Sequence, residues 1–345
     1  MRGYTIKTVV LVLGYRAWDW LERGSLTSIL TAATDIDGDV RIVYLDNYSR
    51  DGSVQWLQEH APEVDVLLSP TNSLYCTGVN TLVQYAARRY RPAYYLLVDA
   101  DNVAEPQCYR RLVEFLDGNL QHGIAQPLVR CLADPAIIYS CGHRFTPDHW
   151  CLPNTELPVD PAVLLDLPSS SISSTAVRAG VFERCGLLNP IYEIYYESAD
   201  LSARARSAGF KLACVPEAVA YNDGTEAIGI DSMHHRYYFN RNRLIYWRLH
   251  DREVFAEVAA EARRRLAELD ARLAVSEYGL DATEESIRRG LTAGLTLTAD
   301  EAALCRASPG LFDYDKTTAV LIQTGRPPTG DAAAHQPHHG GRVTD

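Results

Sequence analysis

The sequence has 345 residues, 47% of them hydrophobic, and a formal net charge of −11 at pH 7. A chain of this length and composition buries a substantial core, as one large domain or two small ones. The negative charge argues against a general nucleic-acid binder, because such proteins gain affinity by neutralising phosphates.

The eight cysteines are scattered and form no C-x-x-C pair, which predicts the reduced thiols of a cytoplasmic protein. No signal peptide is expected, because residues 1–7 lead directly into the first predicted strand. No apolar run approaches the roughly 20 residues that a membrane span requires. The Arg- and Ala-rich composition favours a bacterial source.

The first half of the chain alternates short apolar runs with segments of helical periodicity. This alternation predicts an α/β fold in which a mostly parallel sheet is flanked by helices. We expect strands at residues 8–13, 40–45, 64–68 and 94–99, and helices at 18–33, after Ser53 as N-cap, at 78–90 and at 106–116.

Two carboxylates follow the clearest of these strands, the run Tyr-Tyr-Leu-Leu-Val at residues 94–98. Asp99 and Asp101 are two residues apart, so on an extended chain they face the same side. Both therefore reach one divalent cation, or one holds the cation and the other a ribose. A solvated loop with two acids is the alternative.

The predicted strands end at Gly14, Asp46 and Asp99, and parallel strands bring these ends to one edge of the sheet. A nucleotide is the expected ligand there. No G-x-G-x-x-G follows the first strand and no G-x-x-x-x-G-K-[ST] occurs, which disfavours a standard dinucleotide site or P-loop.

The second half carries another acidic pair. Glu197 and Asp200 lie three apart at the entry of a predicted helix that ends near residue 208, so they share a face. The alternative is that both simply complement the helix dipole. The next predicted helix, 234–249, is dense in aromatic residues and arginines, whose forks suit a pyrophosphate; an amphipathic helix with a solvated basic face is the alternative.

The C-terminal third is expected to be helical. Residues 251–275 form a strongly amphipathic pattern, which packs on the rest of the chain, pairs with a second subunit as a homodimer, or rests on an anionic membrane surface. Nearby acids favour packing or dimerisation. We predict a nucleotide-sugar transferase domain at 1–250, a helical extension at 251–324 and a disordered tail at 325–345.

Together, these motifs resemble an inverting family 2 glycosyltransferase with the GT-A fold, closest to rhamnosyltransferase-like bacterial members. The resemblance runs from about residue 7 to residue 247. It rests on six segments taken as a set: the first strand with Gly14-Tyr15, the D-N-x-S-x-D-G-[ST] match at 46–53, Asn72 with Gly78-Val-Asn80, the D-x-D at 99–101, the partial E-D-x-D-L-x-x-R match at 197–204 and the R-N-R at 241–243.

This resemblance implies a donor that is a UDP-, dTDP- or GDP-sugar, a Mn²⁺ or Mg²⁺ cofactor, and a saccharide or small-molecule aglycone as acceptor. The acceptor wall is expected in the insertion at 131–168, around Phe145, His149 and Trp150. The implied donor contacts are Gly14, Tyr15, Asp46, Asn47, Asp51, Asn80, Asp99, Arg241 and Arg243; the implied metal ligands are Asp99 and Asp101.

Two departures from the family pattern affect the predicted chemistry. Ser198 replaces the second acid of the E-D pair, which leaves Glu197 or Asp200 as the catalytic base, and we favour Glu197. Asn222-Asp223 stands where the family commonly has a metal-binding His, so Asp223 is the expected third metal ligand, or His234 or His235 substitutes for it.

Two other functions compete with glycosyl transfer. The departures at Ser198 and Asn222 motivate a non-catalytic nucleotide-sugar-binding protein. A sugar-1-phosphate nucleotidyltransferase is less favoured, because it requires a Gly-rich basic loop after the first strand, and residues 14–17 (Gly-Tyr-Arg-Ala) do not supply one.

Overall fold

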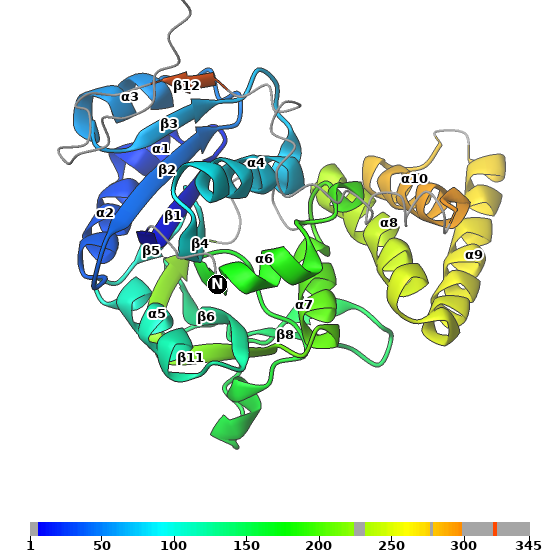
Figure 1. Cartoon of the computed structure of the whole chain (residues 1–345). Coiled ribbons are helices and arrows are strands. Elements are labelled where there is room, and N and C mark those ends of the chain that lie inside the picture. Colours follow the sequence, from blue (N-terminus) through cyan, green and yellow to red (C-terminus); the bar gives the residue numbers. More distant parts are fainter. Residues whose placement is uncertain (1–5, 224–231, 277–278, 299–319, 323–345) are drawn as a thin grey trace, which may run out of the picture.

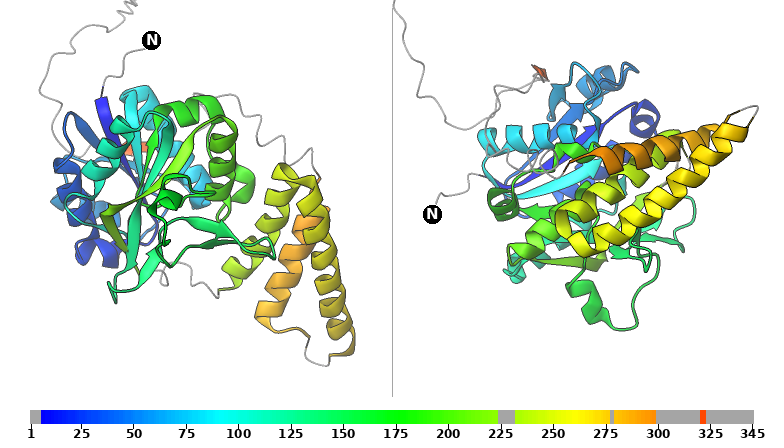
Figure 2. Two further views of the ribbon diagram at one scale, coloured as in Figure 1. Left: turned by 90° about the horizontal axis from the view of Figure 1, so that it is seen from below. Right: turned by 90° about the vertical axis from the view of Figure 1, so that its right-hand side faces the viewer.

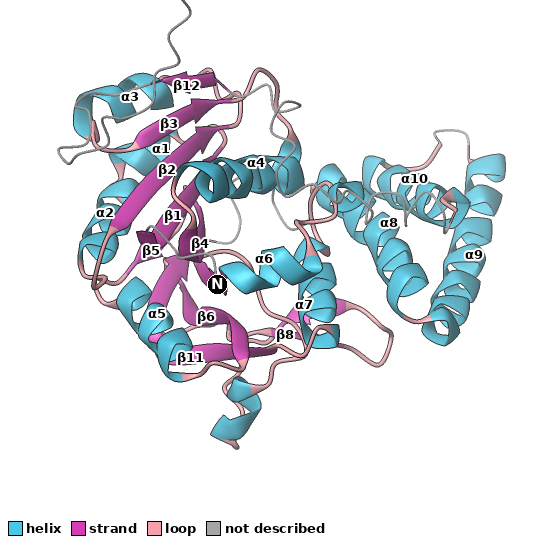
Figure 3. Cartoon of the chain, in the orientation of Figure 1, coloured by secondary structure: helices cyan, strands magenta, loops and turns pink. Residues whose placement is uncertain are grey.

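The computed structural model describes residues 6–223, 232–276, 279–298 and 320–322. It confirms the α/β class: one mostly parallel sheet is flanked by helices, and further helices follow at the C-terminal side (Figures 1 and 3). The predicted tail at 325–345 lies outside the described residues.

The sheet has the strand order β12-β3-β2-β1-β4-β10-β6-β11-β5. The strands β1 to β4 pair in parallel, and β6 pairs in parallel with β11. Between these two parallel groups lies β10, which is antiparallel to both of its neighbours. The bounds are β1 Ile6–Gly14, β2 Val40–Asp46, β3 Asp65–Leu68, β4 Pro92–Asp99, β5 Val103–Ala104, β6 His122–Cys131, β10 Thr175–Arg178, β11 Lys211–Asn222 and β12 Val320–Ile322.

Side chains alternate between two apolar layers along each central strand, as a sheet buried on both faces requires. Val9 and Leu11 of β1 face one layer, and Val10 and Val12 face the other. The first layer packs under α4 (Leu74–Arg89), α6 (Ala179–Cys185) and α7 (Glu197–Ser207). The second packs under α1 (Trp18–Glu22), α2 (Ser25–Thr34), α3 (Ser53–His60) and α5 (Cys108–Gly118).

Several predicted boundaries were wrong. The helix expected at 18–33 is two helices, because Gly24 adopts a left-handed φ of 90° between them. Residues 211–222, for which no strand was given above, form one strand, β11, with a register shift between Val215 and Val219. Ser53 is not an N-cap but the first residue of α3: Gly52 is the cap, and Asp51 accepts hydrogen bonds from Ser53.

The insertion at 131–168 is structured by three short strands and a 3₁₀ turn. Its strands are β7 Ile138–Ser140, β8 His143–Phe145 and β9 Cys151–Pro153, and η1 spans Pro161–Leu165. Phe145 stacks on Tyr246, and Trp150 stacks on Phe239 with ring centroids 5.3 Å apart in both pairs. The insertion is therefore held against the helix that carries Phe239 and Tyr246.

That helix, α8 (Met233–His250), forms a three-helix bundle with α9 (Arg252–Val275) and α10 (Ala282–Thr296), seen beside the α/β part in Figure 2. The helix predicted at 251–275 is confirmed. Val258, Ala262 and Leu291 share the small apolar core of the bundle. In the described part of the chain, no helix is both long and apolar enough to cross a membrane.

The packing of α10 on α8 depends on a close backbone approach at Gly290. A Cβ built there would lie 2.4 Å from the carbonyl oxygen of Tyr237, whereas a Cβ at Gly118 would meet nothing within 4 Å. We expect Gly290→Ala to lower the free energy of unfolding by about 1–3 kcal/mol through overpacking. Gly118→Ala, the matched control, should leave it unchanged or raise it by about 0.4–1 kcal/mol. Denaturant unfolding checks both; equal stability of the two variants would contradict the packing described.

Candidate active site

The carboxyl ends of β1, β2 and β4 meet at one edge of the sheet, as predicted. In the strand register Gly14 lies opposite Asp46, and Leu13 lies opposite Asp99. Backbone hydrogen bonds continue past the strands: Asn47 N donates to Gly14 O at 2.8 Å. A Cβ at Gly14 would overlap the Tyr44 hydroxyl, so this position requires glycine for packing alone. The carboxyl ends of these three strands, at Gly14, Asp46 and Asp99, are thus held at one edge of the sheet.

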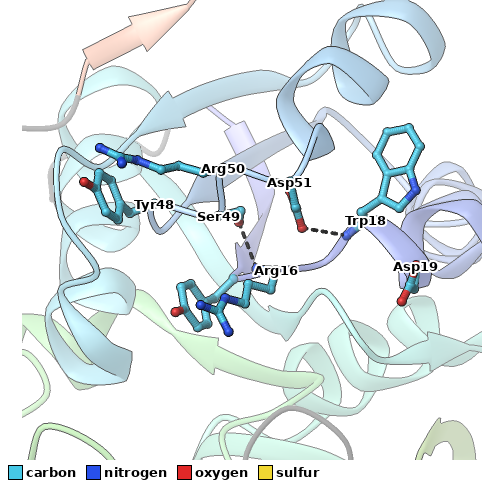
Figure 4. A pocket seen from close by; sticks show the side chains of 8 residues that line it. Arg16, Trp18, Asp19, Tyr48, Ser49, Arg50 and Asp51 are labelled. Carbon is cyan, nitrogen blue, oxygen red and sulfur yellow. Dashed lines mark hydrogen bonds between the residues drawn. The ribbon is translucent and has the colours of Figure 1, made fainter.

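A cavity of about 540 Å³ opens beside the ends of β1 and β2 (Figure 4). Its walls carry aromatic rings and guanidinium groups together: Arg50 lies 4.0 Å from the ring centre of Tyr48, and Arg16 lies 5.3 Å from that of Tyr15. Such walls suit a flat ring and an anionic group. The lining residues are Tyr15, Arg16, Trp18, Asp19, Tyr48, Ser49, Arg50 and Asp51.

Asp51 joins the two turns that form this cavity. Its carboxylate accepts a hydrogen bond from Trp18 N at 3.1 Å and two from Ser53. Burial alone would raise the pKa of Asp51, but the hydrogen bonds from Ser53 and Trp18 outweigh it and hold the pKa below its usual value. The backbone N–H of Arg16 is likewise held, by the Ser49 hydroxyl at 2.9 Å. The cavity is therefore preformed.

Asp46 and Asn47 differ in what they offer a ligand. One oxygen of Asp46 accepts from Ser49 N at 3.1 Å, and the other, Oδ1, is buried with no hydrogen-bond partner among the described residues. Burial raises the pKa of this carboxyl. The amide of Asn47 is instead fully engaged with the loop before α4: it donates to Asn72 and Leu74 and accepts from Ser73.

Asp99 and Asp101 form the second acidic group of this edge. Burial, and for Asp99 the neighbouring charge of Asp101, raises the pKa of both carboxyls. The nearby hydroxyl groups of Ser173 and Tyr75 act in the opposite direction and lower the pKa of Asp99 in part. Oδ1 of Asp101 is buried and without a hydrogen-bond partner in the part of the chain that the structure describes. A pair of desolvated carboxylates with a free oxygen is an arrangement that a bound divalent cation stabilises.

The predicted third metal ligand lies within electrostatic reach, since the charge of Asp223 raises the pKa of Asp101. Across the described ranges, however, no three His, Cys, Asp or Glu side chains come together as a complete metal site. His235 packs on the ring of Tyr195, with centroids 4.9 Å apart. Two carboxylates still fit Mg²⁺ or Mn²⁺, because such ions commonly take one or two carboxylates and complete their shell with phosphate oxygens and water.

Glu197 is the first residue of α7 and is only 7% exposed. Burial, with a smaller contribution from Asp200, raises its pKa to about 7. Its Oε2 has no hydrogen-bond partner among the residues described. The charges of Glu197 and Asp99 both act on the buried Tyr75 hydroxyl, and Glu197 also raises the pKa of Asp99. Glu197 therefore lies within electrostatic range of Asp99 and of the Tyr75 hydroxyl.

Asp200, the other candidate base, is fully buried and fully paired. One oxygen accepts from Arg204 Nε at 2.8 Å, and the other lies 2.8 Å from His250 Nε2. Burial would raise the pKa of Asp200, but Arg204 and His250 outweigh it and lower the pKa. Arg204 also donates to the carbonyl groups of Cys185 and Leu187. The two acids therefore differ: Glu197 has a raised pKa and an Oε2 without a hydrogen-bond partner among the described residues, whereas Asp200 is ion-paired and has a lowered pKa.

Three residues that were expected to contact the donor instead bind other parts of the protein. Asn80 forms two hydrogen bonds with the backbone of Leu188, at 2.9 and 3.0 Å. Arg241 donates to Ile191 O at 2.8 Å. Arg243 pairs with Glu261 of α9 at 2.6 Å and lies 4.0 Å from the ring centre of Trp150. The contacts of these side chains are with α8, α9 and neighbouring loops rather than with the strand-end acids.

The site also includes tyrosines that the sequence did not single out. Besides Tyr75, two tyrosines are affected by these acids. In addition to burial, the charges of Asp101 and Asp99 raise the pKa of Tyr139, and the charge of Glu197 raises the pKa of Tyr195. These tyrosines form no sequence motif, because they come from separate segments: Tyr75 from α4 and Tyr139 from the insertion. Only the assembled fold brings them to the acids.

Residues 10–152 match the model of the family "Glycosyl transferase family 2". A search of curated proteins finds no match. The solved structure of GalNAc-T7 with UDP, GalNAc and Mn²⁺ is 14% identical with a TM-score of 0.55, and the alignment covers 85% of this chain but 55% of that one. That likeness shows the same fold.

Two further solved structures resemble the chain. The mannosyltransferase PcManGT from Pyrobaculum calidifontis, in complex with GDP-Man and Mn²⁺, is 15% identical with a TM-score of 0.49, covering 89% of this chain and 74% of that one. TarS 1–349 of S. aureus, in complex with UDP-GlcNAc, is 13% identical with a TM-score of 0.49, covering 88% and 91%. The family match at residues 10–152 and the shared fold together support a glycosyltransferase.

Proposed function

We propose that the chain transfers a sugar, with inversion, from a nucleoside-diphosphate sugar to an acceptor hydroxyl, and that Glu197 is the catalytic base. The observation that carries this proposal is the state of Glu197: it is buried, it has a raised pKa and an unpaired oxygen among the described residues, and it shares a neighbourhood with Asp99. A general base works best when its pKa lies near the working pH.

In this proposal the donor lies along the strand-end edge. The nucleoside enters the 540 Å³ cavity, which is lined by Tyr15 and Asp51. Asp46, whose Oδ1 has no hydrogen-bond partner among the described residues, precedes the lining residues 48–51 in the sequence. Gly14 leaves room for the Tyr44 hydroxyl at the end of β1, and Asn47 holds the loop before α4. Asp99 and Asp101, with Asp223 nearby, would hold the divalent cation, which would neutralise charge on the diphosphate.

The transfer is a single in-line displacement. The acceptor oxygen attacks the anomeric carbon, the bond from that carbon to the diphosphate oxygen breaks, and the acceptor proton passes to the carboxylate of Glu197. The nucleoside diphosphate leaves with the bonding electrons. Asp200 cannot take this proton, because both of its oxygens are paired and its pKa is lowered. Burial of the site further strengthens the electrostatic contacts that hold donor and acceptor in line.

The rhamnosyltransferase-like resemblance places dTDP-sugars among the donors to test, together with UDP- and GDP-sugars. The seven described cysteines are free thiols, which supports a cytoplasmic location. A saccharide or an aglycone is the acceptor class. Phe145, His149 and Trp150, proposed from the sequence to form part of the acceptor wall, line the contact between the insertion and α8.

Incubation with each nucleotide-sugar and Mn²⁺, with products read by mass spectrometry, tests the proposal. We expect release of nucleoside diphosphate from one donor class, first as slow hydrolysis and faster with the acceptor. Binding of a nucleotide-sugar in calorimetry without any release of diphosphate would instead favour the binding-protein alternative.

The pH dependence of the reaction tests Glu197 separately. Because burial raises the pKa of Glu197 to about 7, the carboxyl is protonated below that pH and cannot accept a proton. We expect kcat, measured at saturating donor and Mn²⁺, to rise about tenfold per pH unit on the acid side and to level off above about pH 7. A kcat that stays flat between about pH 5 and pH 8 would contradict a base with this pKa.

A further inference from the structure

The backbone just before Glu197 is unusually bent. Glu193, Tyr195 and Tyr196 have φ values of 62°, 67° and 67°, the left-handed region that residues other than glycine rarely occupy. Such conformations persist only where surrounding contacts enforce them, and they gather at functional sites. The bent segment 191–196 sets the position at which α7, and with it Glu197, begins.

Asn242 of α8 enforces this bend from inside the protein. Its side chain is fully buried, and its amide nitrogen lies 2.8 Å from the carbonyl oxygens of Tyr192 and Ile194 and 2.9 Å from that of Tyr195. One NH₂ group thus serves three carbonyl groups within four consecutive residues. Without this amide, Ile194 O and Tyr195 O would lose a partly buried donor, which is unfavourable, whereas Tyr192 O would keep the N–H of Ile194.

Neighbouring side chains form further hydrogen bonds that hold the bent segment. Arg241 donates to Ile191 O at 2.8 Å and to Asn242 Oδ1 at 2.9 Å, which orients the amide. Tyr238 donates to the carboxylate of Glu193. From the opposite direction, Cys76 N of α4 donates to Glu193 O at 2.9 Å. Arg241 and Asn242 of the R-N-R segment therefore donate hydrogen bonds to backbone carbonyl groups of the bent segment.

We propose that Asn242 is a positioning residue: through the carbonyl groups of residues 192, 194 and 195 it fixes where Glu197 stands relative to the strand-end acids. This inference rests on the proposed role of Glu197 as base. It also makes α8 part of the catalytic apparatus, since the helix that begins the C-terminal bundle sets the geometry of a residue on α7.

Asn240 offers a matched control on the same helix. Its amide donates to Arg236 O, within α8, and among the described residues it forms no hydrogen bond to the bent segment. We therefore compare Asn242→Ala with Asn240→Ala in the full chain. Tyr238→Phe is a milder second variant, which removes one hydroxyl from the contacts of the bent segment and leaves the core filled.

Hydrogen exchange, measured without substrate, reads the bent segment directly. We expect faster exchange at the amides of residues 191–199 in Asn242→Ala, a smaller increase in Tyr238→Phe, and no change in Asn240→Ala. In turnover assays we expect Asn242→Ala to lower kcat by roughly 10²-fold with KM for the donor unchanged, because misplacing a catalytic group by about 1 Å costs that much.

The two readouts separate failure of this inference from failure of the proposed function. Wild-type exchange rates in a folded Asn242→Ala, or faster exchange with unchanged kcat, would overturn the positioning role. If Asn242→Ala does not fold, the same criteria apply to Tyr238→Phe. If no donor is turned over by the wild-type chain, the proposed function fails, while faster exchange in Asn242→Ala would still establish that Asn242 holds the segment.

Discussion

Glu197→Gln is expected to lower kcat for sugar transfer by about 10²- to 10⁴-fold, the usual loss when a general base is removed. The substitution keeps the size of the side chain and removes only its capacity to take a proton. Glu197 is buried, and its Oε2 has no hydrogen-bond partner among the described residues, so loss of the charge does not break an ion pair. We therefore expect an unchanged fold.

The matched control for this variant is Glu183→Gln, an exposed glutamate on α6. Calorimetry with the nucleoside diphosphate should give the same Kd for wild type, Glu197→Gln and Glu183→Gln, since the proposed role of Glu197 concerns the acceptor proton. A Glu197→Gln enzyme with near-wild-type kcat would assign the base to another group. A large loss of nucleotide affinity would instead place Glu197 in donor binding.

Asp101→Asn is the second substitution with a large expected effect. The Asp101 carboxyl is desolvated, and its Oδ1 has no hydrogen-bond partner in the described part of the chain, which is costly in the absence of a cation. Removing this charge should leave the melting temperature of the metal-free protein unchanged or higher. Wild type should gain stability with Mn²⁺ and nucleoside diphosphate, about 2.7 kcal/mol at a hundredfold excess over Kd, and Asp101→Asn should lose this gain.

Activity should fall with it. We expect Asp101→Asn to reduce kcat by about 10²- to 10³-fold, comparable to removing one preorganised group that stabilises developing charge. Asp117→Asn is the control, because that aspartate is an ordinary half-exposed partner of Lys7 and Tyr94. Full Mn²⁺-dependent stabilisation of Asp101→Asn would show that the cation lies elsewhere.

The sequence is informative about the site wherever a residue type follows from its place on a strand. Residues 94–98 are apolar, β-prone and followed by two acids, and the parallel register then places Asp99 opposite Leu13, at the same edge of the sheet as Gly14 and Asp46. The alternation of strands and helices likewise predicts the sheet of the first half. Local pattern and topology are sufficient for these features because both depend on neighbouring residues.

What the sequence does not show is which polar side chains are already satisfied by distant backbone. Asn80 carries a residue type expected at a nucleotide, yet it bonds Leu188, 108 residues later. Asp200 and Glu197 look equivalent in sequence, and only His250 and Arg204 distinguish them. The antiparallel strand β10 was not predicted either, because its four residues carry no pattern that separates them from a loop.

We propose that acids from three separate segments of the chain surround one bound sugar diphosphate and its cation. Crystals soaked with Mn²⁺ and the nucleoside diphosphate that binds most tightly test it directly, by anomalous diffraction at the manganese edge. We expect a manganese peak coordinated by Asp101, the diphosphate beside it, the nucleobase in the cavity lined by Tyr15 and Asp51, and Glu197 facing the open side of the diphosphate. A peak remote from Asp99 and Asp101, or a nucleotide bound away from the carboxyl ends of β1, β2 and β4, would contradict it.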